Sequence, residues 1–459
     1  MMNAISRREL LAGAALGSLT GASPKRPNIL LLFPDQLRHD WINRVPALDV
    51  HTPNIDALAA RGMRFVNAIV PSPLCAPSRA CLASGREYGE CGVVNNSENF
   101  PLNASTYYKL LRDSGYFVAG CGKLDLAKKA LDWGEDGKRF LHEWGFSDGI
   151  NNEGKHDAVQ SVAKGTKGPY MAFLRKAGLA EKHLQDIHAR KDYSATFPTT
   201  LTEDAYCDNW LSTNGINLIK RAPKDKPWHL AVNFTGPHSP MDITARMEKT
   251  VRGRNYLQPN GSPQFTPEVH VAIRQNYTAM VENIDRWVGK YVELLKQRGE
   301  LDNTIIVFSS DHGEMLGDHS RWGKSVPWQE SVGVPLIMAG PGIQHAKSDA
   351  LVSVMDLAAT FLDYGGVATP SGMDSRTLRH LVEGRTKLHR EYLVSGLDQW
   401  EMAWNGRHKF IRGFEAEPQL YDLAADPSEN RNIVKRDKRM AEEMEAMLPA
   451  RRAGVKKIV

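Results

Sequence analysis

Cysteine is scarce in this sequence of 459 residues, which contains only five of them. They are scattered and show no CxxC spacing, so neither a zinc site nor a disulfide framework is indicated. Their positions are Cys75, Cys81, Cys91, Cys121 and Cys207. A bridge that involves Cys81 or Cys91 stays open, because an exported chain would enter an oxidising compartment.

Long hydrophobic runs are missing as well. The apolar run 12–19 is much shorter than the roughly 20 residues that a membrane helix needs, so no membrane span is expected. Arg7 and Arg8 precede this run and small residues follow it, which is typical of a bacterial signal peptide over residues 1–22. The paired arginines favour the twin-arginine export machinery over the ordinary secretory route. We therefore predict a periplasmic or secreted protein.

The sequence also lacks a strong excess of one charge. Its formal net charge of +5 comes from 58 Lys and Arg against 53 Asp and Glu. Residues 431–459 hold nine basic and four acidic residues, and residues 1–26 hold four basic and one acidic. The intervening part therefore carries slightly more acidic than basic residues. A nucleic-acid partner is not expected, although a local basic pocket stays possible.

Apolar runs alternate with helical patterns along the first three quarters of the chain. Continuous apolar runs at 28–33, 116–122, 228–234 and 304–309 predict buried parallel strands. Helical patterns lie at 105–114, 202–220 and 267–298. This alternation predicts an α/β fold with a mostly parallel central sheet flanked by helices. Open sheets of this kind bind ligands beyond the carboxyl ends of their strands.

A smaller domain is expected after a helix at 354–362, because glycines and prolines at 365–372 mark a boundary. We assign residues 27–365 to a large α/β domain and 366–459 to a smaller α+β domain with an antiparallel sheet. Its expected strands are 392–395, 402–404, 408–412 and 419–423, closed by a helix at 437–448. Residues 148–200 show few apolar runs and are expected to form an insertion or lid outside the core.

Polar residues at the strand ends form the first candidate site. Asp35 and Gln36 follow the first apolar run, and Asp311 and His312 follow the run at 304–309. These four side chains could converge on one divalent cation. Their oxygens suit Ca²⁺ or Mg²⁺, whereas the imidazole shifts the balance towards Mn²⁺ or Zn²⁺. Taken singly, an aspartate after a strand is more often a helix cap or a turn residue.

A proline-rich segment before an expected helix at 80–84 forms the second candidate site. With Pro77 near its first turn, Cys75 would lie at the positive end of the helix and Arg79 one turn further on. That position lowers a thiol pKa and favours anion binding. For an isolated cysteine, a buried structural role is the alternative.

The stretch 75–79 (CAPSR), followed by 82–86 (LASGR), resembles the signature of type I sulfatases, the formylglycine-dependent family of the alkaline phosphatase superfamily. Similar blocks follow in the family's order at 27–36, 115–126, 237–240, 303–334 and 420–427. On these motifs the chain is identified as a member of that family, with an alkaline phosphatase-like fold.

The resemblance implies that a formylglycine-generating or sulfatase-maturing enzyme converts Cys75 to formylglycine (3-oxoalanine). One hydroxyl of its hydrate would attack sulfur in line, and the other would then expel sulfate on losing its proton. It assigns a divalent cation, Ca²⁺ first and Mg²⁺ or Mn²⁺ otherwise, to Asp35, Gln36, Asp311, His312 and the modified Cys75. Arg79 and Lys123 would hold the hydrate, while His238 and Lys324 would face the sulfate, one of them protonating the leaving alcohol.

Two positions depart from the usual family pattern. Leu124 and Asp125 follow Lys123 where a Trp-His pair is common, and Gln36 stands where a second aspartate is common. Asp125 can orient Lys123 or another cation, but it cannot donate a proton at neutral pH unless its pKa is strongly raised. Gln36 removes one negative charge from the metal ligands while keeping an oxygen.

The sequence thus predicts a sulfatase that hydrolyses a sulfate monoester, expected on a sulfated carbohydrate. A sulfamidase or an aryl or choline sulfatase would share the same core. The alternative is a phosphomonoester or phosphonate-ester hydrolase of the same superfamily, and a third hypothesis is a non-catalytic protein that binds sulfated glycans. Trp41, Trp400 or Trp404 would offer a sugar a stacking surface, unless these side chains are buried.

Overall fold

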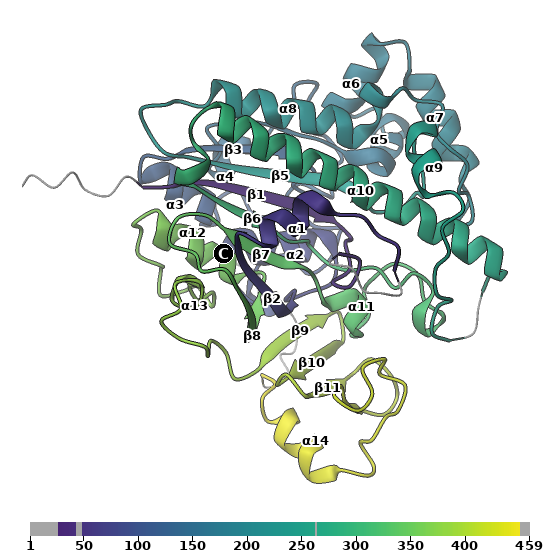
Figure 1. Cartoon of the computed structure of the whole chain (residues 1–459), viewed down its shortest axis with the longest axis vertical. Coiled ribbons are helices and arrows are strands. Elements are labelled where there is room, and N and C mark those ends of the chain that lie inside the picture. The colour runs from purple at the N-terminus through teal and green to yellow at the C-terminus, as the bar shows by residue number, and fades with distance from the viewer. Residues whose placement is uncertain (1–25, 43–47, 262–263, 450–459) are drawn as a thin grey trace, which may run out of the picture.

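The computed structural model describes residues 26–42, 48–261 and 264–449, which form one large sheet between helices and one small separate sheet (Figure 1). The predicted signal peptide, residues 1–22, lies outside the described residues. Among the helices of the described part, none is long and apolar enough to cross a membrane.

The large sheet has eight strands in the order β4-β3-β5-β1-β6-β7-β2-β8. β1 pairs in parallel with β5 and β6, and β3 pairs in parallel with β4 and β5, whereas β7 is antiparallel to both neighbours. The bounds are β1 Asn28–Asp35, β2 Gly62–Ile69, β3 Phe117–Gly122, β4 Asp148–Asn151, β5 Trp228–Pro237, β6 Thr304–Phe308, β7 Leu336–Ala339 and β8 Ala346–Ser353. The predicted α/β class with a mostly parallel sheet is confirmed.

Helices cover both faces of this sheet. Their bounds are α1 Pro53–Ala59, α2 Cys75–Ser84, α3 Tyr107–Asp113, α4 Leu141–Trp144, α5 Gly154–Ala163, α6 Pro169–Lys176, α7 Ala180–Ala189, α8 Cys207–Arg221, α9 Ala245–Val251, α10 Pro267–Gln297, α11 Gln329–Val332, α12 Asp356–Tyr364, α13 Arg379–Val382 and α14 Lys438–Glu445. Four predicted helices, those at 105–114, 202–220, 267–298 and 354–362, correspond to α3, α8, α10 and α12.

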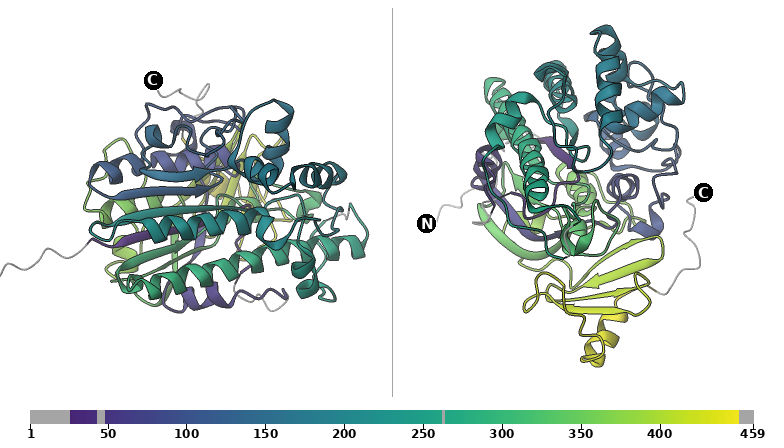
Figure 2. Two further views of the ribbon diagram at one scale, coloured as in Figure 1. Left: turned by 90° about the horizontal axis from the view of Figure 1, so that it is seen from above. Right: turned by 90° about the vertical axis from the view of Figure 1, so that its right-hand side faces the viewer.

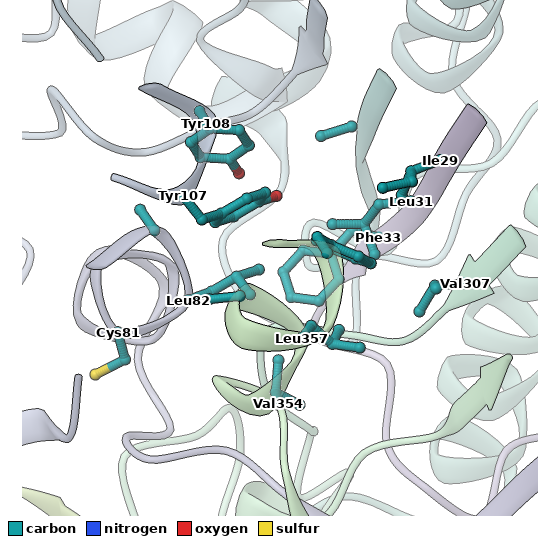
Figure 3. Packing of buried hydrophobic residues seen from close by; sticks show 14 of the residues in the cluster. Ile29, Leu31, Phe33, Cys81, Leu82, Tyr107, Tyr108, Val307, Val354 and Leu357 are labelled. Atoms are coloured by element: carbon teal, nitrogen blue, oxygen red, sulfur yellow. The ribbon is translucent and has the colours of Figure 1, made fainter. Parts of the chain in front are cut away.

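The side chains of β1 alternate between two apolar cores. One core joins the odd-numbered residues Ile29 to Phe33 with α2, α3 and α12, and the other joins Leu30 and Leu32 with α1, α8 and α10. Figure 3 shows the first core, with Tyr107 and Leu82 beside Phe33. Because both faces of the sheet are covered at β1, consecutive residues of this strand are apolar. This continuous apolar run is why the strand could be predicted from the sequence.

Residues 148–200 differ from the expectation. β4 is the edge strand of the large sheet and pairs in parallel with β3, so the prediction that this segment lies outside the core is wrong at its start. The helices α5, α6 and α7 that follow pack around Tyr170 and Leu174 and against residues of α8 (Figures 1 and 2).

The small sheet is antiparallel, as predicted, in the order β12-β11-β10-β9. Its strands are β9 Leu393–Leu397, β10 Trp400–Trp404, β11 His408–Arg412 and β12 Gln419–Asp422, and Met444 of α14 packs on one face. Figure 2 shows this sheet beneath the large one. The domain boundary near residue 365 stays a prediction.

The tryptophans proposed for sugar stacking are buried. Trp41, Trp400 and Trp404 are 1%, 6% and 4% exposed. Trp400 and Trp404 pack with Ile69 and Val332 in the apolar contact that joins the two sheets. The stacking hypothesis is therefore wrong for these three side chains.

All five cysteines are free thiols and all are buried. The structure therefore contains no bridge at Cys81 or Cys91, the two positions that the sequence left open.

Candidate active site

Cys75 begins helix α2 at the carboxyl edge of the large sheet, so the helix starts earlier than the predicted residue 80. The side chain is 1% exposed. Burial and Asp35 act to raise the pKa of this thiol, but Lys123, Lys324 and His312 outweigh them and lower it to about 6. The residue therefore lies in a pocket that stabilises a negative charge on its side chain.

Four buried side chains converge on one point beside this helix end. The ligand atoms of Asp35, Cys75, Asp311 and His312 all lie within 4.8 Å of one another. His312 Nε2 is 3.2 Å from Cys75 Sγ, 3.7 Å from Asp35 Oδ1 and 3.6 Å from Asp311 Oδ2. The other ring nitrogen of His312 donates to the Gly313 carbonyl at 3.1 Å, which directs Nε2 towards the other three ligand atoms. This donor set fits a divalent cation.

Gln36 completes the predicted ligand group. Its backbone adopts a left-handed conformation, with φ of 71°, and its backbone N–H donates to Asp311 Oδ1 at 3.0 Å. The side-chain Oε1 accepts a hydrogen bond of 2.5 Å from Lys324 Nζ, and Nε2 donates to Glu314. The structure thus brings four of the five residues that the sequence assigned to a metal to one point, and Gln36 contacts one of them, Asp311, through its backbone.

Arg79 and Lys123 bring positive charge to the same point. Arg79 Nε donates to Asp311 Oδ2 at 2.9 Å, and one terminal nitrogen donates to Asn233 Oδ1 at 2.8 Å. Lys123 Nζ pairs with Asp35 and lies 3.8 Å from Cys75 Sγ. Burial acts to raise the pKa of Asp35, but Lys123 and the other cations hold it well below its usual range. Asp35 is therefore ionised.

His238 and Lys324 occupy the partly exposed side of the cluster. Lys324 Nζ donates to His238 Nε2 at 2.7 Å, and His238 Nδ1 donates to the Ser239 carbonyl at 2.5 Å. Removal from bulk water and the Lys324 ammonium hold the pKa of His238 well below its usual range. His238 is therefore neutral and accepts the hydrogen bond from Lys324.

Comparison with known families agrees with this geometry. The family model described as Sulfatase matches residues 27–367, and the model for the C-terminal part of N-sulphoglucosamine sulphohydrolase matches residues 317–454. The chain belongs to the sulfatase family. The resemblance seen in the sequence is confirmed, and this sulfatase is a sulfuric ester hydrolase.

Relatives of this sulfatase match along most of their length. It is 26% identical to an arylsulfatase of Clostridium perfringens, over 89% of this chain and 90% of the relative. It is 25% identical to an N-acetylglucosamine-6-O-sulfatase of Bacteroides thetaiotaomicron, over 92% and 86%. Among solved structures, a phosphonate monoester hydrolase of Agrobacterium radiobacter has a TM-score of 0.78 at 22% identity, over 92% and 94%. This last similarity shows the shared fold.

Asp125 lies between two lysines of the sulfatase. Lys123 Nζ is 3.2 Å from Asp125 Oδ2, and Lys128 Nζ is 3.1 Å from the same oxygen and also pairs with Asp157 of α5. Burial acts to raise the pKa of Asp125, but the two lysines keep it well below its usual range. The ionised Asp125 therefore holds Lys123 in place and has no proton to donate.

Several residues around the site were not predicted from the sequence. Asn233 contacts Arg79, Lys128 contacts Asp125, and Glu314 contacts Gln36. Tyr193, from the segment 148–200, donates to Glu314 Oε2 at 3.0 Å. Asn233 had a sequence signal, as the polar residue near the carboxyl end of an apolar run. Lys128 and Tyr193 had none, because only the fold brings them to the site.

Proposed function

We propose that this sulfatase hydrolyses sulfate monoesters of carbohydrates with a formylglycine formed from Cys75. The observation that carries the proposal is the position of Cys75, which shares one buried point with Asp35, Asp311 and His312 and faces Lys123. A cysteine with a purely structural role would need neither the converging ligands nor the cations.

The five residues Asp35, Gln36, Asp311, His312 and the modified Cys75 would hold the divalent cation. Two carboxylates and an amide oxygen favour Ca²⁺, while the imidazole keeps Mg²⁺ and Mn²⁺ as alternatives. When bound, the cation would supply positive charge that polarises oxygen atoms at the reacting centre.

Formylglycine supplies, once hydrated, two hydroxyl groups on one carbon. Arg79 and Lys123 would orient that group and stabilise negative charge on it, since both are fixed by buried carboxylates. Asp125 would keep Lys123 in position from the opposite side. These residues are thus arranged before substrate binds.

Lys324 would protonate the leaving alcohol. Its ammonium donates to the neutral His238, whose Nε2 can only accept in this arrangement. His238 would therefore orient Lys324, while Lys324 holds the proton to be transferred.

A sulfated carbohydrate is the proposed substrate class. The named activity of the Bacteroides relative, on N-acetylglucosamine 6-O-sulfate, supports it. The predicted signal peptide supports a periplasmic or secreted enzyme, made with the help of a maturing enzyme and the export machinery. Export suits an enzyme that acts on extracellular glycans.

Release of inorganic sulfate from N-acetylglucosamine 6-O-sulfate tests the proposal. The enzyme from its native host should release sulfate, and both chelation and Cys75→Ala should abolish release. Sulfate release that persists in Cys75→Ala would contradict a mechanism based on this residue. Glycan binding without turnover by the parent enzyme would favour the non-catalytic hypothesis.

A phosphonate-ester or phosphomonoester hydrolase is the second candidate. Gln36 stands where a second aspartate is common, so the ligand group carries one negative charge fewer. This makes the pocket more tolerant of a dianionic substrate. Rates on matched sulfate, phosphate and phosphonate esters of one alcohol separate the two functions. Clearly higher rates on the phosphate or phosphonate ester would overturn the proposal that the substrate is a sulfate ester.

A further inference from the structure

Glu314 lies next to the metal ligands but is not one of the predicted site residues. Its carboxylate is 0% exposed. One oxygen, Oε1, accepts the backbone N–H groups of Leu316 at 3.0 Å and Gly323 at 2.6 Å. The other oxygen, Oε2, faces the site, where it accepts from Gln36 Nε2 and from the Tyr193 hydroxyl. Four donors therefore fix this carboxylate.

The contact with Glu314 fixes the orientation of the Gln36 amide. A carboxylate can only accept hydrogen bonds, so the Gln36 atom beside it must be the NH₂ group. The amide oxygen is then directed the opposite way, where Lys324 Nζ donates to it. Without Glu314, only the hydrogen bond from Lys324 Nζ would favour this orientation of the amide, and the NH₂ group would lose its acceptor.

Tyr193 holds the same oxygen of Glu314 from the other side. Its ring lies 4.6 Å from the ring of Trp322, and its hydroxyl approaches Gly323, the residue before Lys324. The segment 148–200 thus reaches the metal ligands through one hydroxyl group.

We propose that Glu314 is a positioning residue that selects the amide oxygen of Gln36 as a metal ligand and supplies, one layer further out, the negative charge that Gln36 lacks. Tyr193 fixes Glu314 in that role. The inference rests on the proposed metal site. The inference predicts that substitutions at positions 36 and 314 have coupled effects on cation affinity, because a carboxylate at position 36 would lie against the carboxylate of Glu314.

Calorimetric titration of the chelator-treated protein with CaCl₂ alone, and separately with MnCl₂, tests the coupling. Glu314→Gln should weaken cation binding about 10- to 100-fold, the usual effect of losing a residue that orients a metal ligand. Gln36→Asp should also weaken it, although counting ligand charges alone predicts tighter binding. The double variant Gln36→Asp/Glu314→Gln should recover most of the loss, and Tyr193→Phe should give a smaller loss than Glu314→Gln.

Glu153→Gln is the matched control, because Glu153 is also a buried glutamate that accepts two backbone N–H groups. Its cation affinity should equal that of the parent. Tighter binding by Gln36→Asp, or strictly additive losses in the double variant, would overturn the inference. If Glu314→Gln does not fold, the cation affinities of Gln36→Asp and Tyr193→Phe still test the inference. A parent protein that binds neither cation would instead refute the proposed metal site itself.

Discussion

At the scale of single residues, the site is organised by opposite charges in contact. Asp35 and Asp311 each pair with a buried cation, and Asp125 pairs with two lysines. Such pairs are costly to bury unless each charge is matched, so removing one partner disturbs its neighbours. The proposed roles are therefore tested best by changes that leave the outer partners in place.

Substitution of Lys324 tests which residue protonates the leaving group. Lys324→Met should reduce kcat by about 10²- to 10⁴-fold on alkyl sulfates, whose alcohols are poor leaving groups. On 4-nitrophenyl sulfate the loss should be much smaller, because that leaving group needs no proton. Steady-state kinetics on the two esters measures the difference.

His238→Gln is the companion variant to Lys324→Met. It should show a smaller loss with the same dependence on the leaving group, because His238 orients Lys324 and holds no proton to transfer. A leaving-group dependence in His238→Gln, but not in Lys324→Met, would reverse the assignment.

The predicted site residues were found because each stands in a short motif beside a strong strand or helix signal. The pairs at 35–36 and 311–312 directly follow apolar runs, and Cys75 and Arg79 share one helix. Glu314 stood inside a recognised block, but its contact with Gln36 depends on how two distant loops meet. The spacing of these two residues along the chain does not predict that contact.

At the scale of elements, the strands of the large sheet that were predicted are buried and have five or more residues, whereas β2, β4, β7 and β8 were not predicted. β1, β5 and β6 are buried along their whole length and read as apolar runs. β2 carries Arg64 and Asn67, and the first half of β8 is partly exposed, so their patterns are weaker. β4 has four residues and two of them are partly exposed, which is why its segment was taken for an insertion.

The N-terminus of α6 is held by a buried carboxylate. Glu153 accepts the backbone N–H groups of Tyr170 at 3.3 Å and Met171 at 2.9 Å. Gly168 is required beside it, since a Cβ at this position would lie 2.2 Å from the Glu153 side chain. Burial raises the pKa of Glu153 to about 7, against the effect of these N–H donors.

This raised pKa predicts a pH dependence of stability. The folded state binds the Glu153 proton more tightly than the unfolded state, whose pKa is near 4.5. The tighter binding of this proton contributes on the order of 3 kcal/mol to the free energy of unfolding. The contribution is fully present below pH 4.5 and is lost as the pH rises through about 7. Glu153→Gln should flatten the free energy of unfolding over this range, measured by urea denaturation at several pH values. The exposed Glu181→Gln should leave the slope unchanged, and an unchanged slope in Glu153→Gln would refute the prediction.

At the scale of the whole molecule, the small sheet supports two of the segments that carry active-site residues. Gly396 N–H donates to the Pro71 carbonyl at 3.0 Å, on the segment that leads to Cys75. Trp400 Nε1 donates to the Ser325 carbonyl at 3.2 Å, next to Lys324. Apolar residues of the two sheets also share one cluster, although the boundary between the sheets shows in the sequence only as glycines and prolines.

A buried ion pair strengthens this contact. Lys409 of β11 lies 2.8 Å from Glu429, at 0% and 1% side-chain exposure, and Lys409 also donates to the Pro327 carbonyl at 3.2 Å. Lys409→Met should destabilise the protein by about 3–5 kcal/mol, because Glu429 is left buried without its partner. Urea denaturation measures the loss.

The double variant Lys409→Met/Glu429→Gln should recover much of that stability, since no unpaired charge remains. Loss of the exposed pair in Arg439→Ala should cost much less than loss of the buried pair. Equal effects of the buried and exposed substitutions would contradict the support that we assign to the small sheet.

The central claim is that Cys75 is converted to formylglycine, and mass spectrometry of the tryptic peptide 65–79 tests it most directly. The protein is purified from its native host, so that the maturing enzyme is present. We predict a peptide in which the sulfur of Cys75 is replaced by an aldehyde oxygen, in a preparation that releases sulfate. An active preparation in which this peptide carries only unmodified Cys75 would contradict the account.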